Sequence, residues 1–222
     1  MATPVWEQKS KEAIRSFVRK TTKPLNALLE RDAVEGDTRT FVTDLLVDGL
    51  GYDKYVDLTA EYMVRGEFAD IGIRIDKQIV AFVEIKRVSL NLKEQHLRQV
   101  KTYAANEGVE WAILTNGRVW QVYRISNTTP ITEHLILSVD LLDERTPAAK
   151  ADELWLLSRE ALKRGLLAEK WKAESVLAED YLENALMSES VLKALRAEIR
   201  RNSQQLVDPA NLKSALAKIL AK

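Results

Sequence analysis

FADIGIRI (68–75) and IVAFVEIK (79–86) are two apolar stretches that are separated by only three polar residues. Both are rich in isoleucine, valine and phenylalanine, and two such stretches around a short polar segment are typical of a β-hairpin. The second stretch is almost continuously apolar until Glu84, which indicates a strand that is covered on both faces. We therefore expect this hairpin to form part of the central sheet of an α/β domain.

The sequence around the hairpin predicts further helices and strands. Asn91 is a good N-cap residue with Glu94 three positions later, and Gly108 is a suitable residue just past a helix end. The pair at 116–117, Asn-Gly, is the preferred two-residue turn of a hairpin. Helices are expected at 6–20, 23–32, 37–50 and 92–107, and strands at 55–62, 110–115 and 118–125.

The order of these elements predicts how the sheet is connected. The strand at 79–86, the helix after it and the strand at 110–115 form a crossover unit, so the two strands are expected to be parallel neighbours. Residues 1–145 are thus predicted to be an α/β domain with a mixed β-sheet flanked by helices. Residues 146–222 are predicted to be an all-helical extension. Its periodic segments are 150–165, 168–187, 189–203 and 210–221.

Composition excludes several classes of protein and site. The chain has 222 residues, of which 46% are hydrophobic, and this is enough to bury a core. It has no cysteine and only two histidines, which excludes disulfides, thiol catalysis and cysteine-ligated zinc. No apolar run approaches the roughly 18 residues of a membrane span, and no signal peptide is recognisable. We therefore expect a cytoplasmic protein with no membrane partner. Its 33 basic and 33 acidic residues balance, so any nucleic-acid surface must be a local patch.

Charge at the end of the second strand is the informative feature for function. Glu84 and Lys86 are two positions apart, so they project from the same face of an otherwise apolar strand. Ionised groups beside a core are costly unless they are paired or bind a metal. The hairpin register decides whether Asp70 joins them. A two-residue loop at 76–77 would place Asp70 opposite the residue before Glu84, whereas a three-residue loop at 76–78 would place it opposite Glu84 itself.

The two carboxylates predict a divalent metal site. Carboxylates that face each other repel unless a cation lies between them. Oxygen ligands without histidine or cysteine suit Mg²⁺ or Mn²⁺. A metal held by Asp70, Glu84 and a backbone carbonyl could polarise a phosphodiester oxygen and lower the pKa of a bound water. Lys86 would then stabilise the negative charge that develops on the phosphate.

The motif D-(13 residues)-E-x-K, placed across a hairpin and followed by a helix, resembles the PD-(D/E)xK nuclease superfamily. The similarity is greatest to the N-terminal nuclease domain of type I restriction enzyme R subunits and their stand-alone relatives. Ala69 stands where the family has proline, and the chain has no phosphate loop of an ATP-driven motor. The matching stretches, in the expected order, are EGDTRTFVTDLLVDGLGYD (35–53), FADIGIRI, VAFVEIKR, LRQVKTYA (97–104) and WAILTNGRVWQVYRI (111–125).

This resemblance implies a restriction-endonuclease-like fold for residues 1–145 and roles for individual residues. Asp70 and Glu84 would be metal ligands, and Lys86 would be the catalytic lysine. Glu35 would be the acidic residue on the first core helix that contacts the metal or its water. Glu35 has a second interpretation, as a helix N-terminal acid or as a partner of Arg39 four positions later.

Further residues are candidates for contact with nucleic acid. Gln99 and Tyr103 match the family's Gln-x-x-x-Tyr element, and they either support the catalytic face, touch the DNA backbone or pack as ordinary helix residues. A basic cluster near the same helix could hold phosphates, although such clusters are usually solvated. This cluster consists of Arg87, Lys93, Arg98 and Lys101. Lys193, Arg196 and Arg200 share one face of a late helix; that face could bind DNA, but pairing with acidic residues of a neighbouring helix is favoured.

The combined expectation is a Mg²⁺-dependent endonuclease that hydrolyses DNA phosphodiester bonds and is related to type I restriction R subunits. The resemblance suggests a role in restriction or defence. Cutting a duplex needs two sites, so a homodimer through the C-terminal helices is attractive. One alternative is a catalytically idle nuclease fold that serves as a binding or assembly module. Another is a nuclease subunit that works with a separate motor or methylase subunit.

Overall fold

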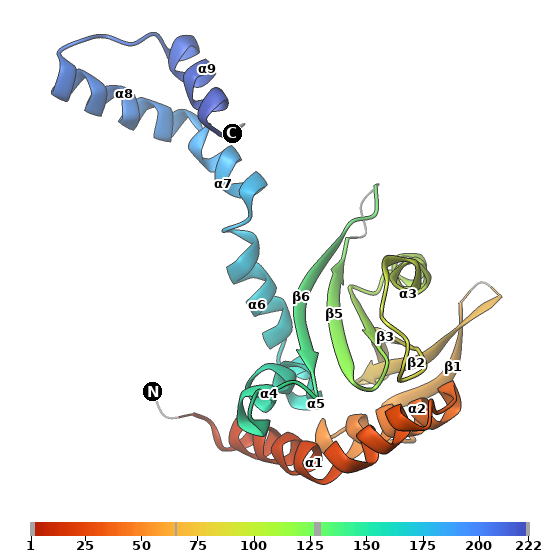
Figure 1. Ribbon diagram of the computed structural model, residues 1–222. Coiled ribbons are helices and arrows are strands. Elements are labelled where there is room, and N and C mark those ends of the chain that lie inside the picture. Colours follow the sequence, from red (N-terminus) through yellow and green to blue (C-terminus); the bar gives the residue numbers. More distant parts are fainter. Residues whose placement is uncertain (1–2, 65, 127–129, 221–222) are drawn as a thin grey trace. The chain divides into compact units, whose positions relative to one another are not determined.

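The computed structural model describes residues 3–64, 66–126 and 130–220. It divides into two compact units, Met1–Ala168 and Glu169–Lys222. The first unit holds a six-stranded mixed sheet flanked by helices, and the second unit is helical (Figure 1). This confirms the predicted fold class. Helix α4 (Pro147–Leu154) belongs to the first unit, where it packs against α1 (Val5–Glu30) and β6 (Glu133–Asp140).

The strands of the sheet lie in chain order. They are β1 (Leu58–Val64), β2 (Glu67–Ile75), β3 (Gln78–Ile85), β4 (Trp111–Thr115), β5 (Val119–Ile125) and β6 (Glu133–Asp140). All neighbours are antiparallel except β3 and β4, which are parallel and are connected through helix α3 (Glu94–Glu107). The predicted crossover unit is therefore confirmed. The sequence analysis assigned no strand to β6, whose irregular alternation of buried and exposed side chains gives a weak periodic signal.

The hairpin of β2 and β3 contains a two-residue turn and a bulge. Ile75 pairs with Gln78 across Asp76 and Lys77, whose φ angles of 50° and 71° are the two positive values that a type I′ turn requires. The register then shifts by one residue at Val80, as it does at a β-bulge. The turn is thus the shorter of the two predicted loops.

The bulge changes which residue lies across from Asp70. Beyond it, Ile71 pairs with Val83, and the same register continued by one residue sets Asp70 across from Glu84. A two-residue turn without the bulge would have set Asp70 across from Val83. The structure thus has the two-residue turn of one predicted alternative and the pairing of Asp70 with Glu84 that was expected for a three-residue turn.

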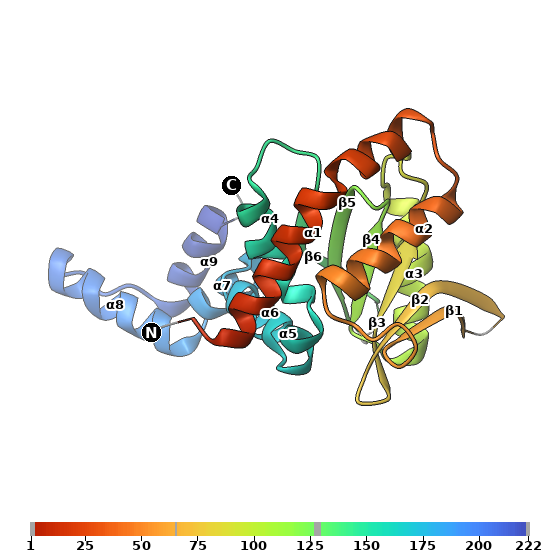
Figure 2. The same cartoon turned by 90° about the horizontal axis from the view of Figure 1, so that it is seen from below.

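Two helices near the N-terminus differ from their predicted bounds. Helix α1 (Val5–Glu30) is continuous and contains Pro24, whereas the sequence predicted two separate helices. Helix α2 (Glu35–Asp44) ends earlier than predicted, because the chain continues as a π-helix, Leu45–Gly49. Figures 1 and 2 show that α2 and α3 lie on opposite sides of the sheet, and both contact β3. The strand that carries Glu84 is therefore covered on both faces.

Helix α3 begins two residues later than the predicted cap at Asn91 allows. The backbone N–H of Lys93 donates to Nδ1 of His96 over 3.1 Å, so His96 caps the first turn in place of Glu94. At the other end, Gly108 has a φ of 66° and ends the helix in the left-handed conformation, as predicted.

The hairpin of β4 and β5 is confirmed, but its turn lies one residue further along than predicted. The backbone N–H of Asn116 donates to the carbonyl of Val119 over 3.3 Å, so Gly117 and Arg118 occupy the turn. The Asn116 side chain accepts hydrogen bonds from the N–H groups of Arg118 and Val119 at 3.1 and 2.7 Å. Asn116 therefore supports the turn from its first position through its side chain.

The second unit consists of helices with little core of their own. It includes α7 (Glu179–Leu186), α8 (Glu189–Ser203) and α9 (Pro209–Leu220), and α6 (Leu166–Ser175) leads into it from the first unit. Among its residues whose burial is described, Leu212 alone is buried. Within the described ranges, no helix combines the length and the apolar character needed to cross a bilayer.

Candidate active site

The structure brings Asp70, Glu84 and Lys86 together at the end of the β2–β3 hairpin. Asp70 comes from β2, Glu84 from the end of β3, and Lys86 follows β3 directly. The Nζ atom of Lys86 donates to Oε1 of Glu84 over 2.5 Å. The negative charge of Asp70 acts on both of the other groups and raises the pKa of each. The register derived from the bulge thus gives the predicted constellation.

Glu84 is a buried carboxylate with one unsatisfied oxygen. Its side chain is 2% exposed, and Oε2 has no hydrogen-bond partner among the described residues. Burial raises the pKa of Glu84 to about 7; the charges of Asp70 and Glu35 add to this rise, and the hydrogen bond from Lys86 opposes it. A buried carboxylate oxygen without a partner is costly unless it binds a cation. Glu84 therefore fits the role of a metal ligand.

Lys86 remains a cation in this environment. Burial alone would lower the pKa of Lys86, but the hydrogen bond to Glu84 and the charges of Glu84, Glu35 and Asp70 raise it above its ordinary value. A protonated lysine has no free lone pair, so it cannot accept a proton at neutral pH. The geometry assigns Lys86 an electrostatic or proton-donating part in any reaction at this site.

Asp70 is held from two directions. Its Oδ2 atom accepts a hydrogen bond of 2.7 Å from the backbone N–H of Ile85, and its Oδ1 atom accepts one from Nη2 of Arg39. Arg39 lies on α2, and its Nη1 atom is also 3.6 Å from Oε1 of Glu61. The sequence analysis considered Arg39 only as a partner of Glu35. Its actual partners come from β1 and β2, which a local spacing rule does not reveal.

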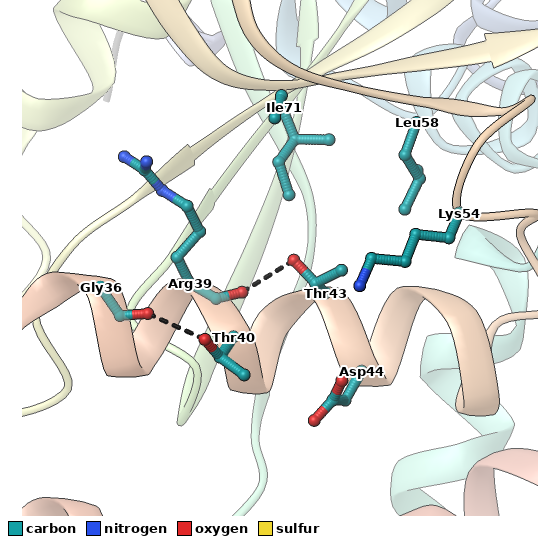
Figure 3. Close-up of a pocket in the computed structure, with 9 residues that line it drawn as sticks. Gly36, Arg39, Thr40, Thr43, Asp44, Lys54, Leu58 and Ile71 are labelled. Atoms are coloured by element: carbon teal, nitrogen blue, oxygen red, sulfur yellow. Dashed lines mark hydrogen bonds between the residues drawn. The ribbon is translucent and has the colours of Figure 1, made fainter.

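A pocket adjoins this carboxylate between α2 and the first two strands (Figure 3). Its volume is about 240 Å³. Arg39 and Thr43 of α2 extend toward the side on which Leu58 and Ile71 lie, and Lys54 approaches from the segment before β1. Arg39 both lines the pocket and binds Asp70, so it connects the pocket to this carboxylate.

Glu35 lies near the site but does not complete a ligand group. It is the first residue of α2 and is exposed, although its charge reaches Glu84 and Lys86. In the described ranges, no group of three or more histidine, cysteine, aspartate or glutamate side chains is placed to hold a metal. Glu35 therefore does not join Asp70 and Glu84 in a group of three such side chains.

Gln99 and Tyr103 form one hydrogen-bonded pair on α3. Nε2 of Gln99 donates to the hydroxyl of Tyr103 over 2.7 Å. Tyr103 is buried in the core with Phe82 of β3 and Leu114 of β4, whereas Gln99 is exposed. Tyr103 thus anchors α3 to the strand that carries Glu84, and Gln99 is the end of the pair that a ligand can reach.

The predicted basic cluster near α3 is largely neutralised. Arg87 pairs with Asp32 at 3.1 Å, Arg98 pairs with Glu94 at 3.1 Å, and Lys101 pairs with Glu133. Within the described residues, Lys93 is the member that forms no ion pair. Contact of this cluster with phosphates therefore stays a prediction.

His96 is a further residue near the site. In addition to capping α3, it lies close enough to Lys86 and Lys93 that their positive charges, together with burial, lower its pKa. The sequence analysis gave His96 no place in the site, because its role as a cap became apparent only once the start of α3 was known.

Part of the first unit matches a known family. The family model of the type I restriction enzyme R protein N terminus matches residues 34–136, a little under half of the chain. The matched segment contains the hairpin with Asp70, Glu84 and Lys86, and it also contains Arg39. Comparisons with curated proteins and with solved structures found no match.

Proposed function

Residues 34–136 are a PD-(D/E)xK-like nuclease domain of the type I restriction enzyme R family. We propose that the chain hydrolyses DNA phosphodiester bonds with Mg²⁺ or Mn²⁺. The single observation that carries the proposal is the unsatisfied oxygen of Glu84. It is buried across from Asp70 and beside Lys86, in a family whose nucleases generally use divalent metals.

Each side chain of the site has a part in the proposed reaction. Asp70 and Glu84 would hold the cation, and Glu35 would reach it through water. The cation would polarise a phosphodiester oxygen when bound. Lys86, which stays protonated beside Glu84, would stabilise the negative charge that builds on the phosphate. The N–H of Ile85 keeps Asp70 in place.

A plasmid-nicking assay tests this function. Purified full-length chain is incubated with supercoiled plasmid in Mg²⁺ or Mn²⁺, and each reaction is repeated with EDTA. Wild type should nick the plasmid only with metal, and Lys86→Ala should be inactive. Lys9→Ala, which removes an exposed lysine of α1, should behave as wild type.

If neither wild type nor Lys86→Ala cleaves any of several DNA substrates with either metal, the proposed nuclease activity is refuted. The idle binding or assembly module would then be the better interpretation. Activity that appears only after a co-purifying ATPase is added would instead identify a nuclease subunit of a larger complex with a motor.

We also propose a homodimer through the C-terminal helices. The second unit exposes several apolar side chains within ten positions, namely Leu177 at 70%, Tyr181 at 55%, Leu182 at 42% and Leu186 at 40%. Such side chains are rarely left in water over a continuous patch. Light scattering should give twice the chain mass of 25.2 kDa, and a strict monomer would contradict this proposal.

A further inference from the structure

The last two helices carry an excess of positive charge that lies outside the family match. Residues 189–222 contain seven lysines and arginines but only three acidic residues, Glu189, Glu198 and Asp208. The last two of these carboxylates are engaged. Glu198 accepts hydrogen bonds from Arg201 at 2.5 Å and Asn202 at 3.1 Å. Asp208 accepts the N–H groups of the first turn of α9, at 2.9 and 3.2 Å. Among the described residues, Arg201 is the basic side chain of this segment that forms an ion pair, with Glu198, and the others form none.

Three of these cations converge on one pocket, which we call the basic pocket. Lys193, Arg196 and Arg200 of α8 line it together with Leu206 and Val207 of the loop between α8 and α9, and its volume is about 190 Å³. Figure 1 shows this loop joining the two helices. Spacings of three and four residues place the cations on one helix face.

Arg196 connects the two sides of the basic pocket through a hydrogen bond. Its Nε atom donates to the carbonyl of Val207 over 2.9 Å, which ties the loop to the helix. Lys193 and Arg200 are exposed on either side of it. Among the residues that the structure describes, none of the three forms an ion pair. The favoured expectation, that this face pairs with acidic residues of a neighbouring helix, is not what the structure shows.

The dimensions of the basic pocket suit a chain of phosphates. Lys193 and Arg200 are seven residues apart, about 10 Å along the helix axis. Two cations at this separation can each contact a different phosphate of the same strand, because a strand carries one charge per ~3.4 Å along the axis of a duplex. Leu206, which is 75% exposed beside the cations, offers an apolar contact for a sugar or base. A run of phosphates with apolar groups between them satisfies both features.

We propose that the basic pocket of α8 and α9 binds the phosphodiester backbone of nucleic acid, as a second contact site separate from Asp70, Glu84 and Lys86. The inference rests on the proposed function for the identity of the substrate. The peptide connection to the nuclease domain would raise the local concentration of DNA at the catalytic carboxylates. The chain would thus hold DNA through its second unit and cut it with its first.

Two double variants test the basic pocket in the full-length chain. Lys193→Gln with Arg200→Gln removes two pocket charges but leaves Arg196 and its bond to the loop intact. Lys213→Gln with Lys218→Gln is the matched control, since it removes the same charge from exposed positions of α9 outside the pocket. Circular dichroism should show equal helix content in both variants and wild type.

Binding of a fluorescein-labelled DNA duplex is measured in EDTA over a series of salt concentrations, so that no cleavage intervenes. The pocket variant should bind about tenfold more weakly at low salt. In a plot of the logarithm of the association constant against the logarithm of the salt concentration, the slope should become less negative by about 1.8, as expected for two lost phosphate contacts. The control should keep the slope of wild type.

The outcomes separate this inference from the proposed function. Equal salt slopes for the two variants would overturn the basic pocket even if the plasmid is nicked. Binding of anionic vesicles in place of DNA would overturn it as well. If the pocket variant binds DNA more weakly than the control but wild type never nicks plasmid, the basic pocket is upheld and the nuclease activity is refuted.

Discussion

The two units of the chain handle charge in opposite ways. In the first unit, Asp57 and Glu84 are buried carboxylates, and each accepts a hydrogen bond from a cation. In the second unit, Lys193 and Arg200 are exposed cations with no ion pair among the described residues. A buried charge depends on its partner, and loss of the partner is strongly destabilising, whereas an exposed charge is solvated and can meet a ligand. The first unit is therefore fragile toward charge removal, and the second is tolerant.

The largest effect is expected at the catalytic carboxylates. Asp70→Asn keeps the size of the side chain but removes a charge that the cation needs, so plasmid cleavage should decrease about a thousandfold or more. Asp76→Asn makes the same change at the tip of the same hairpin, where the side chain is exposed and forms an ion pair with Lys163. Initial nicking rates should separate the two variants, and comparable activity in both would argue against Asp70 as a ligand.

The next effect tests the cost of a buried charge that loses its partner. Arg159 donates to Asp57 at 2.6 and 3.3 Å, and the Asp57 side chain is 3% exposed. Arg159→Ala should lower the free energy of unfolding by about 3 kcal/mol, measured by urea denaturation with fluorescence detection. Arg201→Ala breaks an exposed pair of the second unit with Glu198 and should cost less than about 0.5 kcal/mol. Similar losses in the two variants would remove the contrast between the units.

The same pair predicts the response of the first unit to acid. Burial alone would raise the pKa of Asp57, but the hydrogen bonds from Arg159 and from the backbone N–H of Asp53 bring it below its ordinary value of 3.8. A lowered pKa in the folded state means that this stabilisation is complete above pH 3.8 and is lost as the pH falls further. Urea midpoints of wild type should therefore decrease below about pH 4. Arg159→Ala should show a smaller decrease there, and an identical acid response would contradict this assignment.

The smallest effect is expected for Mn²⁺ affinity after substitution of Arg39, which binds Asp70. Arg39 is a cation bound to the carboxylate that should hold the metal, so it competes with the metal for Asp70. Arg39→Gln should therefore raise the affinity for Mn²⁺ without DNA by about tenfold, measured by isothermal titration calorimetry. Thr40→Ala, at a neighbouring position in the same pocket, should leave it unchanged. Weaker Mn²⁺ binding by Arg39→Gln would mean that Arg39 positions Asp70 and does not compete for it.

Much of the first unit could be predicted because its signals are local. The hairpin, the crossover from β3 to β4 and the cap at Gly108 follow from periodicity and turn chemistry, and the structure confirms them. The shift at Val80 could not be read in advance, since a bulge depends on how two strands pack and leaves no fixed residue signature. The sequence consequently left the partner of Asp70 open, and the structure was needed to choose it.

The candidate site shows the same limit. Strand alternation was enough to place Glu84 and Lys86 on one face, whereas the register of the hairpin was needed to place Asp70 with them. Arg39 reaches Asp70 across 31 positions, through the packing of α2 on the sheet, which no spacing rule encodes. The basic pocket depends on an absence of ion pairs. From the sequence, DNA binding by Lys193 and its neighbours was the less favoured alternative, and it gained support only because these cations form no ion pair among the described residues.

The extra residue at Val80 of β3 determines whether Asp70 and Glu84 lie across from each other on the same face of the hairpin. Side chains alternate between faces, so any insertion or deletion of one residue between Asp70 and Glu84 would move one carboxylate to the wrong face unless a compensating bulge appeared or vanished. Two-residue changes at the tip would preserve the pairing. Among proteins that use this carboxylate pair, hairpin lengths should therefore vary in steps of two, and odd steps should mark either a moved bulge or a lost activity.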